Sequence, residues 1–483
     1  MTEDLVDRDM GTALDAFAEL PEWLAAVMTP DRVAESLRRT VPELSEPGTE
    51  LVSVFVDRLR AKGTEWRVHC QVELVQEGRP SEIVLIGRLV PPPAPAPSPA
   101  PTTSAARFGE PGWHGYLPDL RLQLEVEVAD AALPALPRLV DPDEAAGLLQ
   151  QALRDAGYDV EVSGCVPDVV RYKPGSRCTI VYWMQYRGRP GPDPLVVKTH
   201  QGDKGSTAWD AMRALWESPV ARAGVVTLAE PLAYLPEERV LVQGPVPEER
   251  ILKDLARDAL TVAATEESPA ELAPLRDVLL RTAEALAALH GSGTQYGRTA
   301  TWDEELAEVR EVVGRIAYSV PQIGAAADPL LSRLEHLHTS TPPDPLVSAH
   351  HDFRPAQVLL HGGRIGFIDF DGACRAEPAL DLGRFRAKLR DIGISAFRES
   401  GLPLVPGGPL ERHLRLLDEL CDDFLDAYRR HAPVTRERVV LWETTDLLTA
   451  LLHGWTKVRL ARVIPRLTVL RHALETAPFL AAR

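Results

Sequence analysis

The polar residues best suited to chemistry lie between positions 350 and 371, in the stretch HHDFRPAQVLLHGGRIGFIDFD. Gln357 opens one apolar run and Asp369 ends another, with a Gly-Gly turn between the two runs. This pattern predicts a β-hairpin that brings Gln357 near Asp369. A carboxylate beside a buried strand is costly unless it meets a cation or strong hydrogen bonds. We therefore predict that Gln357 and Asp369 supply two oxygen ligands to a hard cation such as Mg²⁺.

Asp352 lies five residues before Gln357, on the segment that leads into the hairpin. A carboxylate at this place is suited to orient an attacking hydroxyl group or to accept its proton. The stretch therefore combines the parts needed to activate a hydroxyl beside a bound divalent cation.

The motif pair HHDFRPAQ and IDFD resembles that of the aminoglycoside phosphotransferase family, which is related to choline kinases. The family pattern is H-x-D-x-x-x-x-N followed by D-F/W-D/E. The resemblance implies an α+β, protein-kinase-like bilobal fold, with an antiparallel sheet in a mixed N-terminal lobe and a mainly helical C-terminal lobe. It also implies transfer of the γ-phosphoryl group of ATP or GTP, with Mg²⁺, to a hydroxyl group of a small molecule.

The resemblance assigns a role to each matching residue. Asp352 is similar to the catalytic aspartate, and His350 to the buried histidine that braces the catalytic loop. Asp369 resembles the principal metal-binding aspartate, and Gln357 takes the place of the metal-binding asparagine. Asp371 is either a supporting group or an alternative ligand.

Three further features belong to the resemblance. Asp381, in the segment PALDLGRF, is similar to a residue that braces the catalytic loop. Residues 286–293, LAALHGSG, resemble the end of the helix that precedes this loop. His351 stands where these kinases often have glycine, so it either narrows or titrates the site, or is an ordinary loop histidine.

Lys198, at the end of the apolar run PLVVK, is where the family has a lysine that binds nucleotide phosphates. The plain alternative is an edge-strand lysine that reaches solvent. An acid on the following helical segment, Asp210 or Glu217, is expected to pair with it. No G-x-G-x-x-G loop is present, and the turn at 173–177 either covers the phosphates or is a simple hairpin turn. Adenine is expected beside residues 240–244.

The composition limits the classes of partner. The chain has 53 basic and 70 acidic residues and a net charge of −17, which disfavours nucleic-acid binding and is compatible with a cationic substrate. Its N-terminus lacks the apolar region of a signal peptide, and no apolar run is long enough to span a membrane. Five cysteines without a C-x-x-C pair indicate reduced thiols. We therefore expect a cytoplasmic protein.

The same composition bears on Gln357 and Lys198. The 483 residues include no asparagine, so glutamine is the one side-chain amide that this chain uses. Gln357 in place of asparagine is therefore weak evidence for a decayed site. Only seven lysines occur, which makes a lysine at the end of an apolar strand more informative.

The proline-rich segment 91–106 predicts an extended linker. It separates an N-terminal α+β unit, 1–90, from a kinase-like N-terminal lobe, 107–245, and a helical C-terminal lobe with the catalytic loop, 246–483.

A helical segment followed by three strand-like runs occurs twice, with an offset of 110 to 112 residues, as in Lys62-Gly63 and Pro174-Gly175. We read residues 1–90 as a partial duplicate of the N-terminal lobe, with chance similarity of turns as the alternative. The offset of 110 makes Arg88 the counterpart of Lys198. The partial copy is expected to cap the lobe, to form a homodimer, or to shape access of the substrate.

Two functions follow from these features. The first is a small-molecule kinase that acts on a sugar, an amino sugar or an aminoglycoside-like compound. Its acceptor contacts are expected from the helical residues 442–459, although amphipathic packing explains most of that pattern. The alternative is a nucleotide-binding pseudokinase that serves as a scaffold or regulator.

Overall fold

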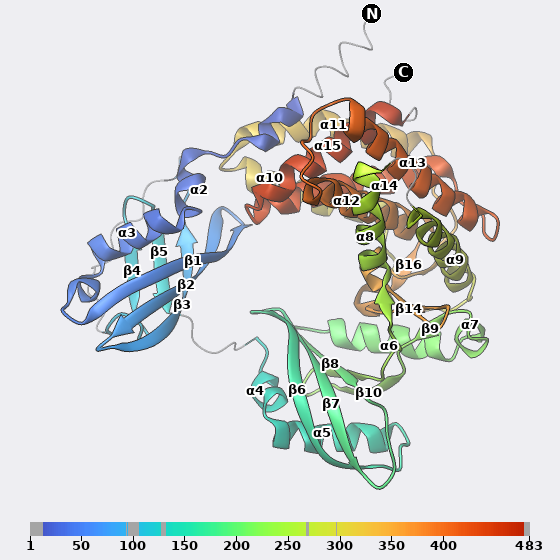
Figure 1. Cartoon of the computed structure of the whole chain (residues 1–483), viewed down its shortest axis with the longest axis horizontal. Helices are drawn as coiled ribbons and strands as arrows, with labels where there is room; N and C mark the ends of the chain where they lie inside the picture. The colour runs from blue at the N-terminus through green and yellow to red at the C-terminus, as the bar shows by residue number, and fades with distance from the viewer. Residues whose placement is uncertain are drawn as a thin grey trace, which may run out of the picture. The chain divides into compact units, whose positions relative to one another are not determined.

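The computed structural model describes residues 13–92, 94, 106–126, 132–266, 270–295 and 297–477 (Figure 1). The chain forms two units, and each is described by itself. The first unit consists of Met1–Ala129, Glu305–His336 and Leu447–Arg483, and the second of Asp130–Glu304 and Leu337–Asp446. The boundaries fall within the helices α10 (Trp302–Ala317), α11 (Pro321–Ser340) and α14 (Arg436–Thr456).

The first unit contains short helices, a five-stranded sheet and a C-terminal helix. Its own elements are η1 (Leu14–Ala18), α2 (Glu22–Val27), α3 (Pro30–Thr40), η2 (Pro42–Ser45), β1 (Thr49–Lys62), β2 (Glu65–Gln76), β3 (Arg79–Leu89), β4 (His114–Leu117), β5 (Leu122–Val126) and α15 (Leu460–Thr476). The strands are all antiparallel, in the order β1-β2-β3-β5-β4.

Alternation along the strands decides which face of this sheet is buried. In β2 the residues Trp66, Val68 and Cys70 are buried and alternate with more exposed polar residues. Trp66 packs edge-on against Trp23, and its indole N–H donates to Ser319 Oγ at 3.2 Å. Helix α3 packs on β1 and β4, which leaves the polar face of the sheet on the opposite side.

The second unit begins with a mixed α+β part. Its elements are α4 (Leu136–Val140), α5 (Pro142–Asp155), β6 (Glu161–Lys173), β7 (Arg177–Arg187), β8 (Leu195–His200), α6 (Lys204–Trp216), α7 (Pro219–Arg222), β9 (Thr227–Leu228), β10 (Pro231–Leu235) and β11 (Val240–Gln243). Asp141 caps α5 by accepting from the backbone N–H groups of Asp143 and Glu144.

A mainly helical part follows. It contains β12 (Arg250–Ile251), α8 (Leu252–Thr265), α9 (Leu272–His290), β13 (Val347–Ala349), η3 (Pro355–Gln357), β14 (Val358–His361), β15 (Arg364–Phe367), η4 (Phe370–Gly372), β16 (Cys374–Ala376), α12 (Ala379–Glu399) and α13 (Gly408–Arg429). A mixed part with an antiparallel sheet, followed by a helical part, confirms the α+β fold class predicted from the sequence.

The sheet of the second unit repeats the topology of the first. Its antiparallel order is β6-β7-β8-β11-β10, which is the same as β1-β2-β3-β5-β4 when each sheet is numbered along the chain. Helix α5 packs on β6 and β10, just as α3 packs on β1 and β4. The predicted helix with three strands is therefore present in both units, and duplication is the interpretation that we keep for it.

Arg88 and Lys198 occupy equivalent positions in the two sheets. Lys198 lies on β8 opposite Leu241 of β11, and Arg88 lies on β3 opposite Gln123 of β5. Both side chains project from the face away from the packed helix, because their neighbours Leu89 and Val197 are fully or almost fully buried. Two residues that are 110 positions apart therefore lie on corresponding strands of the two sheets and on corresponding faces.

The unit boundaries differ from those expected from the sequence. Strands β4 and β5 lie within the predicted lobe 107–245, but β5 pairs with β3 of the first unit and β4 pairs with β5. The C-terminal helix α15 and the end of α14 also belong to the first unit. There Trp455, on α14, donates to the carbonyl of Phe17 at 2.7 Å. These contacts join segments that are far apart in sequence, and local periodicity carries no signal for them.

Most of the predicted linker 91–106 lies outside the described residues. Among the helices described, none is long and apolar enough to cross a membrane.

The helical part packs tightly at the start of α12. Phe385 stacks on Phe353, which precedes the β14–β15 hairpin, and on Phe424 of α13, with ring centroids 5.3 and 4.2 Å apart. Gly383 lies directly against α14, where an added Cβ would be 2.5 Å from the backbone nitrogen of Glu443. Backbone atoms cannot yield as a flexible side chain can, so this glycine sets how closely the two helices approach.

We predict that Gly383→Ala lowers the free energy of unfolding by about 1–3 kcal/mol, because the new methyl group overlaps the backbone of α14. Gly147→Ala is the matched control, since Gly147 is an exposed position of α5 with nothing within 4 Å of its added Cβ. This control should stabilise the chain by about 0.5–1 kcal/mol. Urea unfolding of both variants measures the difference, and equal stability of the two would show that α12 and α14 are less closely packed than described.

Candidate active site

The β14–β15 hairpin brings Gln357 and Asp369 together as the sequence predicts. Val358 pairs with Phe367, and Gln357 Nε2 donates to Asp369 Oδ2 at 3.0 Å. Asp369 leaves the hairpin in the left-handed conformation, with φ 72° and ψ 52°. Aspartate tolerates this conformation better than most residues, and it turns the chain into η4.

Lys198 is buried between two carboxylates of this hairpin end. Its Nζ lies 2.6 Å from Asp369 Oδ1 and 2.7 Å from Asp371 Oδ1, and its side chain is 8% exposed. Burial by itself lowers the pKa of Lys198, but Asp371 and Asp369 outweigh it and raise that pKa. Lys198 is therefore a charged ammonium group, and it is not an edge-strand lysine, because β8 is paired with β7 on one side and β11 on the other.

Asp371 is held by three basic groups. Besides Lys198, it contacts His200 Nε2 at 3.1 Å and Arg177 Nη1 at 3.5 Å. Burial raises the pKa of Asp371, but Lys198 and His200 lower it by more than burial raises it. The pKa of Asp371 is therefore below its usual value. The carboxylate therefore stays ionised at neutral pH.

A continuous series of contacts joins this cluster to Asp352. Arg354 Nη2 lies 3.1 Å from Asp352 Oδ2, and Arg354 Nε donates to Gln357 Oε1 at 3.1 Å. Gln357 in turn contacts Asp369, which pairs with Lys198. Asp352 is half-exposed, with 45% of its side chain open to solvent. The structure thus brings together Asp352, Gln357, Asp369 and Lys198, which are spread over more than 150 residues of sequence.

Asp381 fixes the backbone of the loop that carries Asp352. Its buried carboxylate accepts the backbone N–H groups of His350 and His351 at 2.7 and 2.8 Å and contacts His290 Nε2 at 3.0 Å. Burial raises the pKa of Asp381, but His290 and the contact with His350 bring it below its usual value. Asp381 and His290, at the end of α9, therefore lie where the resemblance implies.

His350 braces the loop from inside the protein. It is fully buried, and its Nε2 donates to the carbonyl oxygen of Ile368 at 2.9 Å, just before Asp369. Its ring packs against Phe370, with centroids 4.5 Å apart. His350 therefore connects the Asp352 loop to the Asp369 hairpin and does not itself face the open site.

His351 lies between two arginines. Its Nε2 is 2.9 Å from Arg298 Nη2, and its Nδ1 is 3.1 Å from Arg384 Nη1. Burial and the charges of Arg384 and Arg298 lower the pKa of His351 to about 3. The ring is therefore neutral, and only one of its nitrogens can accept a hydrogen bond at a time.

The acids expected to pair with Lys198 do not do so. Glu217 ends α6 and forms an ion pair with Arg213 at 3.6 Å, and Asp210 is exposed on the same helix. Lys198 is instead paired with Asp369 and Asp371, because the hairpin end reaches β8.

The turn between β6 and β7 lies near Asp369 and Asp371. Gly175 has φ 67°, and Arg177, the first residue of β7, contacts Asp371. Arg171 of β6 is close enough to Asp369 and Asp352 for their charges to raise its pKa, although burial and Arg177 lower it overall. The turn therefore places arginines beside the site in a chain that lacks a glycine-rich loop.

The donor set suits Mg²⁺ bound together with phosphate groups. The carboxylate of Asp369 and the amide oxygen of Gln357 are hard oxygen donors on neighbouring side chains, and Asp371 is beside them, but it is Nε2 of Gln357 that contacts Asp369. To bind a cation, the Gln357 amide must turn so that Oε1 faces Asp369. No cluster of three or more His, Cys, Asp or Glu residues in the described ranges could hold a metal alone. Such a site needs substrate oxygens and water to complete it.

The aromatic residues at 442–459 have structural roles. Trp442 is buried, and its indole N–H donates to Glu377 Oε1 at 2.6 Å. Trp455 is likewise buried in the first unit. The packing explanation considered from the sequence therefore accounts for both tryptophans, and neither is available to a substrate.

Part of the chain is similar to a known protein family. Residues 220–401 match the APH phosphotransferase enzyme family. This match confirms the resemblance read from the motif pair. The matched range contains His350, Asp352, Gln357 and Asp369, whereas Lys198 lies before it. No curated protein matches the chain.

Solved structures similar to this chain include several kinases. A choline/ethanolamine kinase family protein from Mesorhizobium loti is 18% identical, with 70% of this chain and 96% of that chain covered and a TM-score of 0.44. A glucosamine kinase, in crystal form A, is 16% identical, with 95% and 98% covered and a TM-score of 0.46. A glucosamine kinase in complex with glucosamine, ADP and inorganic phosphate is 18% identical, with 68% and 97% covered and a TM-score of 0.43.

Sequence reasoning missed His200 and Arg177. His200 follows Lys198 by two residues on the same strand, so the period of two would have placed it on the same face. Arg177 ends the predicted turn at 173–177 but was given no role, and its contact with Asp371 depends on long-range packing that no local pattern indicates. The arginines beside His351 gave no signal either, because both are remote from it in sequence.

We predict that His351 makes stability pH-dependent. Its pKa is about 6.5 in the unfolded chain and about 3 in the folded one, so its contribution is complete above pH 6.5 and is lost as pH falls toward 3. His351→Gln should therefore reduce the fall in thermal midpoint between pH 7 and pH 5. His431→Gln, which removes an exposed histidine, is the control and should leave that fall unchanged. The same fall in His351→Gln and in the unmodified chain would contradict a neutral, buried His351.

Proposed function

We propose that this protein is a small-molecule kinase that moves the γ-phosphoryl group of a nucleoside triphosphate, ATP or GTP, to a hydroxyl group of its substrate. The observation that carries the proposal is the series of contacts from Asp352 through Arg354, Gln357 and Asp369 to Lys198. It combines a half-exposed carboxylate, a pair of metal-type oxygen donors and a buried ammonium group. The phosphotransferase match over residues 220–401 supports the same reaction class.

Lys198 and the hairpin acids are the nucleotide side of the proposed site. Mg²⁺ held by Gln357 and Asp369 would neutralise charge on the phosphates. Lys198 binds the phosphates as a cation, since its two carboxylate partners keep it protonated. Arg177 adds a second positive charge beside Asp371. Phosphoryl transfer depends mainly on such positioning and charge stabilisation.

Asp352 is the acceptor side of the proposed site. Its carboxylate orients the attacking hydroxyl and takes its proton. Asp381 fixes two backbone N–H groups next to Asp352, so the loop cannot turn away from the hairpin. His350 and Arg354 add contacts from the buried and open sides of the loop. The carboxylate is therefore positioned before the substrate binds.

The acceptor belongs to the sugars, amino sugars or aminoglycoside-like compounds in this proposal. The net charge of −17 favours the approach of a cationic molecule. A cytoplasmic location and a homodimer formed through residues 1–90 stay predictions.

We predict Mg²⁺-dependent consumption of nucleotide with at least one hydroxyl compound in a panel of these classes. Asp352→Asn should lower kcat by about 100-fold or more, because it removes the proton acceptor with little change in size. Asp210→Asn is the matched control, since it removes an exposed carboxylate from α6 and should leave turnover intact. Turnover is measured by release of the nucleoside diphosphate.

Two outcomes would contradict the proposal. One is full turnover in Asp352→Asn. The other is nucleotide binding, seen as a thermal shift, without turnover on any compound of the panel. The second outcome would favour the scaffold or regulator considered from the sequence, which no observation in the structure now supports.

We also predict that Gln357→Asn raises the Mg²⁺ concentration needed for half-maximal activity by roughly 10-fold. The shorter side chain withdraws the amide from Asp369 and breaks its contact with Arg354. Gln322→Asn, at an exposed position of α11, makes the same chemical change away from the site and serves as control. If activity depends on Mg²⁺ in the same way in all three proteins, Gln357 is not a metal ligand.

A further inference from the structure

The face of the first sheet opposite α3 carries a row of basic residues. Arg60 of β1 pairs with Arg67 of β2, and Arg67 pairs with Arg88 of β3. The row continues through Gln123 of β5 to Tyr116 of β4. Directly paired residues share a face, so three guanidinium groups, an amide and a phenol form one line across five strands. We call these five residues the basic row.

The neighbouring positions on this face add two positive and two negative charges, so the excess of positive charge comes from the basic row itself. Arg58 and Lys62 flank Arg60 on β1, and their partners are His69 and Glu65. Glu125 supplies a further carboxylate on the same face as Gln123. The face therefore has five formal cations and two carboxylates among these described residues, in a chain whose net charge is −17.

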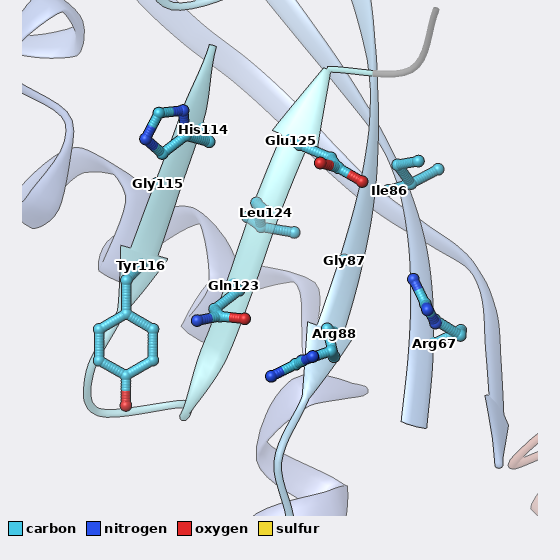
Figure 2. A pocket seen from close by; sticks show the side chains of 10 residues that line it. All are labelled: Arg67, Ile86, Gly87, Arg88, His114, Gly115, Tyr116, Gln123, Leu124 and Glu125. Carbon is cyan, nitrogen blue, oxygen red and sulfur yellow. The ribbon is translucent and has the colours of Figure 1, made fainter. Parts of the chain in front are cut away.

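The basic row borders a cavity of about 370 Å³ (Figure 2). Its polar lining consists of Arg67, Arg88, His114, Tyr116, Gln123 and Glu125. Figure 2 shows these side chains projecting from neighbouring strands on the same face of the sheet. A cavity of this size holds a small molecule rather than a single ion.

The charges of the basic row are incompletely compensated. Like charges in directly opposite positions of a sheet destabilise it. Arg88 Nη1 pairs with Glu65 at 3.0 Å, but its buried Nε has no hydrogen-bond partner. Arg67 forms no ion pair within the part of the chain described here. Burial and the nearby Arg58 lower the pKa of Arg60. An anion beside these groups would relieve the repulsion.

The first sheet has an excess of positive charge because Arg88 lacks the acidic partners that Lys198 has in the second sheet. Arg88 has the same strand position and face as Lys198, but Lys198 is neutralised by Asp369 and Asp371 of the hairpin. Arg88 has a single carboxylate partner, Glu65, on the adjacent strand. The first sheet therefore keeps the cationic side of such a site without the acids that would bind a metal.

We propose that this cavity binds a phosphate monoester of a small polyhydroxylated molecule. Arg67 and Arg88 take the phosphate group, because neighbouring guanidinium groups match its oxygens in charge and geometry. Gln123 and Tyr116 hydrogen-bond the hydroxyl groups, as their amide and phenol both donate and accept. The binding site is separate from the proposed kinase site and does not depend on its activity. A long polyanion is a poorer fit, since the rest of the acidic surface repels it.

The test is isothermal titration of the full chain with glucose 6-phosphate, and with glucose and inorganic phosphate as comparators. We expect saturable binding of glucose 6-phosphate, weaker binding of inorganic phosphate and none of glucose. The double variant Arg67→Gln/Arg88→Gln should weaken glucose 6-phosphate binding at least 10-fold. Arg79→Gln, at the far end of β3, removes the same charge outside the basic row and should change nothing. Tyr116→Phe should weaken glucose 6-phosphate binding but not that of inorganic phosphate.

Further variants separate this site from the kinase site and from loss of folding. Lys198→Met alters the kinase site and should leave binding in the first unit unchanged. If the double variant does not fold, Arg67→Gln alone replaces it, because this exposed side chain forms no ion pair within the described ranges. The proposal is overturned if no saturable binding occurs, if the arginine variants bind as the unmodified chain does, or if Lys198→Met abolishes all binding. Equal effects of Tyr116→Phe on both anions would overturn the assignment of a monoester.

Discussion

An ammonium group buried between two carboxylates is the interaction on which the candidate active site depends. Lys198 comes from a strand of the mixed part, and Asp369 and Asp371 come from the hairpin of the helical part. Leaving any of the three charges buried and unpaired would cost several kcal/mol, of the order of 3–5 kcal/mol. Electrostatics therefore brings the two parts of the second unit to a common point, and that point is where nucleotide phosphates and a cation would bind.

The surrounding contacts hold this cluster in place without occupying its open side. Asp381 accepts two successive backbone N–H groups, and His350 bonds to the carbonyl that precedes Asp369. The stacked rings of Phe385 and Phe424 connect the same loop, through Phe353, to α12 and α13. The backbone of the loop is thus held by buried side chains of its own surroundings, which fixes the loop even when no substrate is bound.

The sequence was most informative where chemistry is local. The hairpin of 357–369 could be predicted because its ligands, turn and apolar runs are contiguous, and Lys198 because lysine is scarce. Arg177 and His200 were missed, since their shared partner Asp371 is about 170 to 190 positions away. Strands β4 and β5 fall in the range predicted for the N-terminal lobe, 107–245, because the proline-rich segment before them looks like a boundary, whereas β5 pairs with β3 of the first sheet. The shared strand order of the two sheets could be recognised only from the strand pairing in the structure, because the sequence does not show which strands are neighbours.

Asp369 has a left-handed backbone conformation, which is unusual for a residue other than glycine even though aspartate tolerates it better than most. Its φ of 72° is the region that glycine enters freely and that other residues enter at a cost of about 1–3 kcal/mol. A glycine there would relax the backbone while removing the carboxylate that Lys198 and Gln357 contact. Loss of that carboxylate would leave the buried Lys198 with fewer acidic partners, so a freer backbone would not offset the broken ion pair. The backbone strain is therefore located at a position whose carboxylate contacts both Lys198 and Gln357.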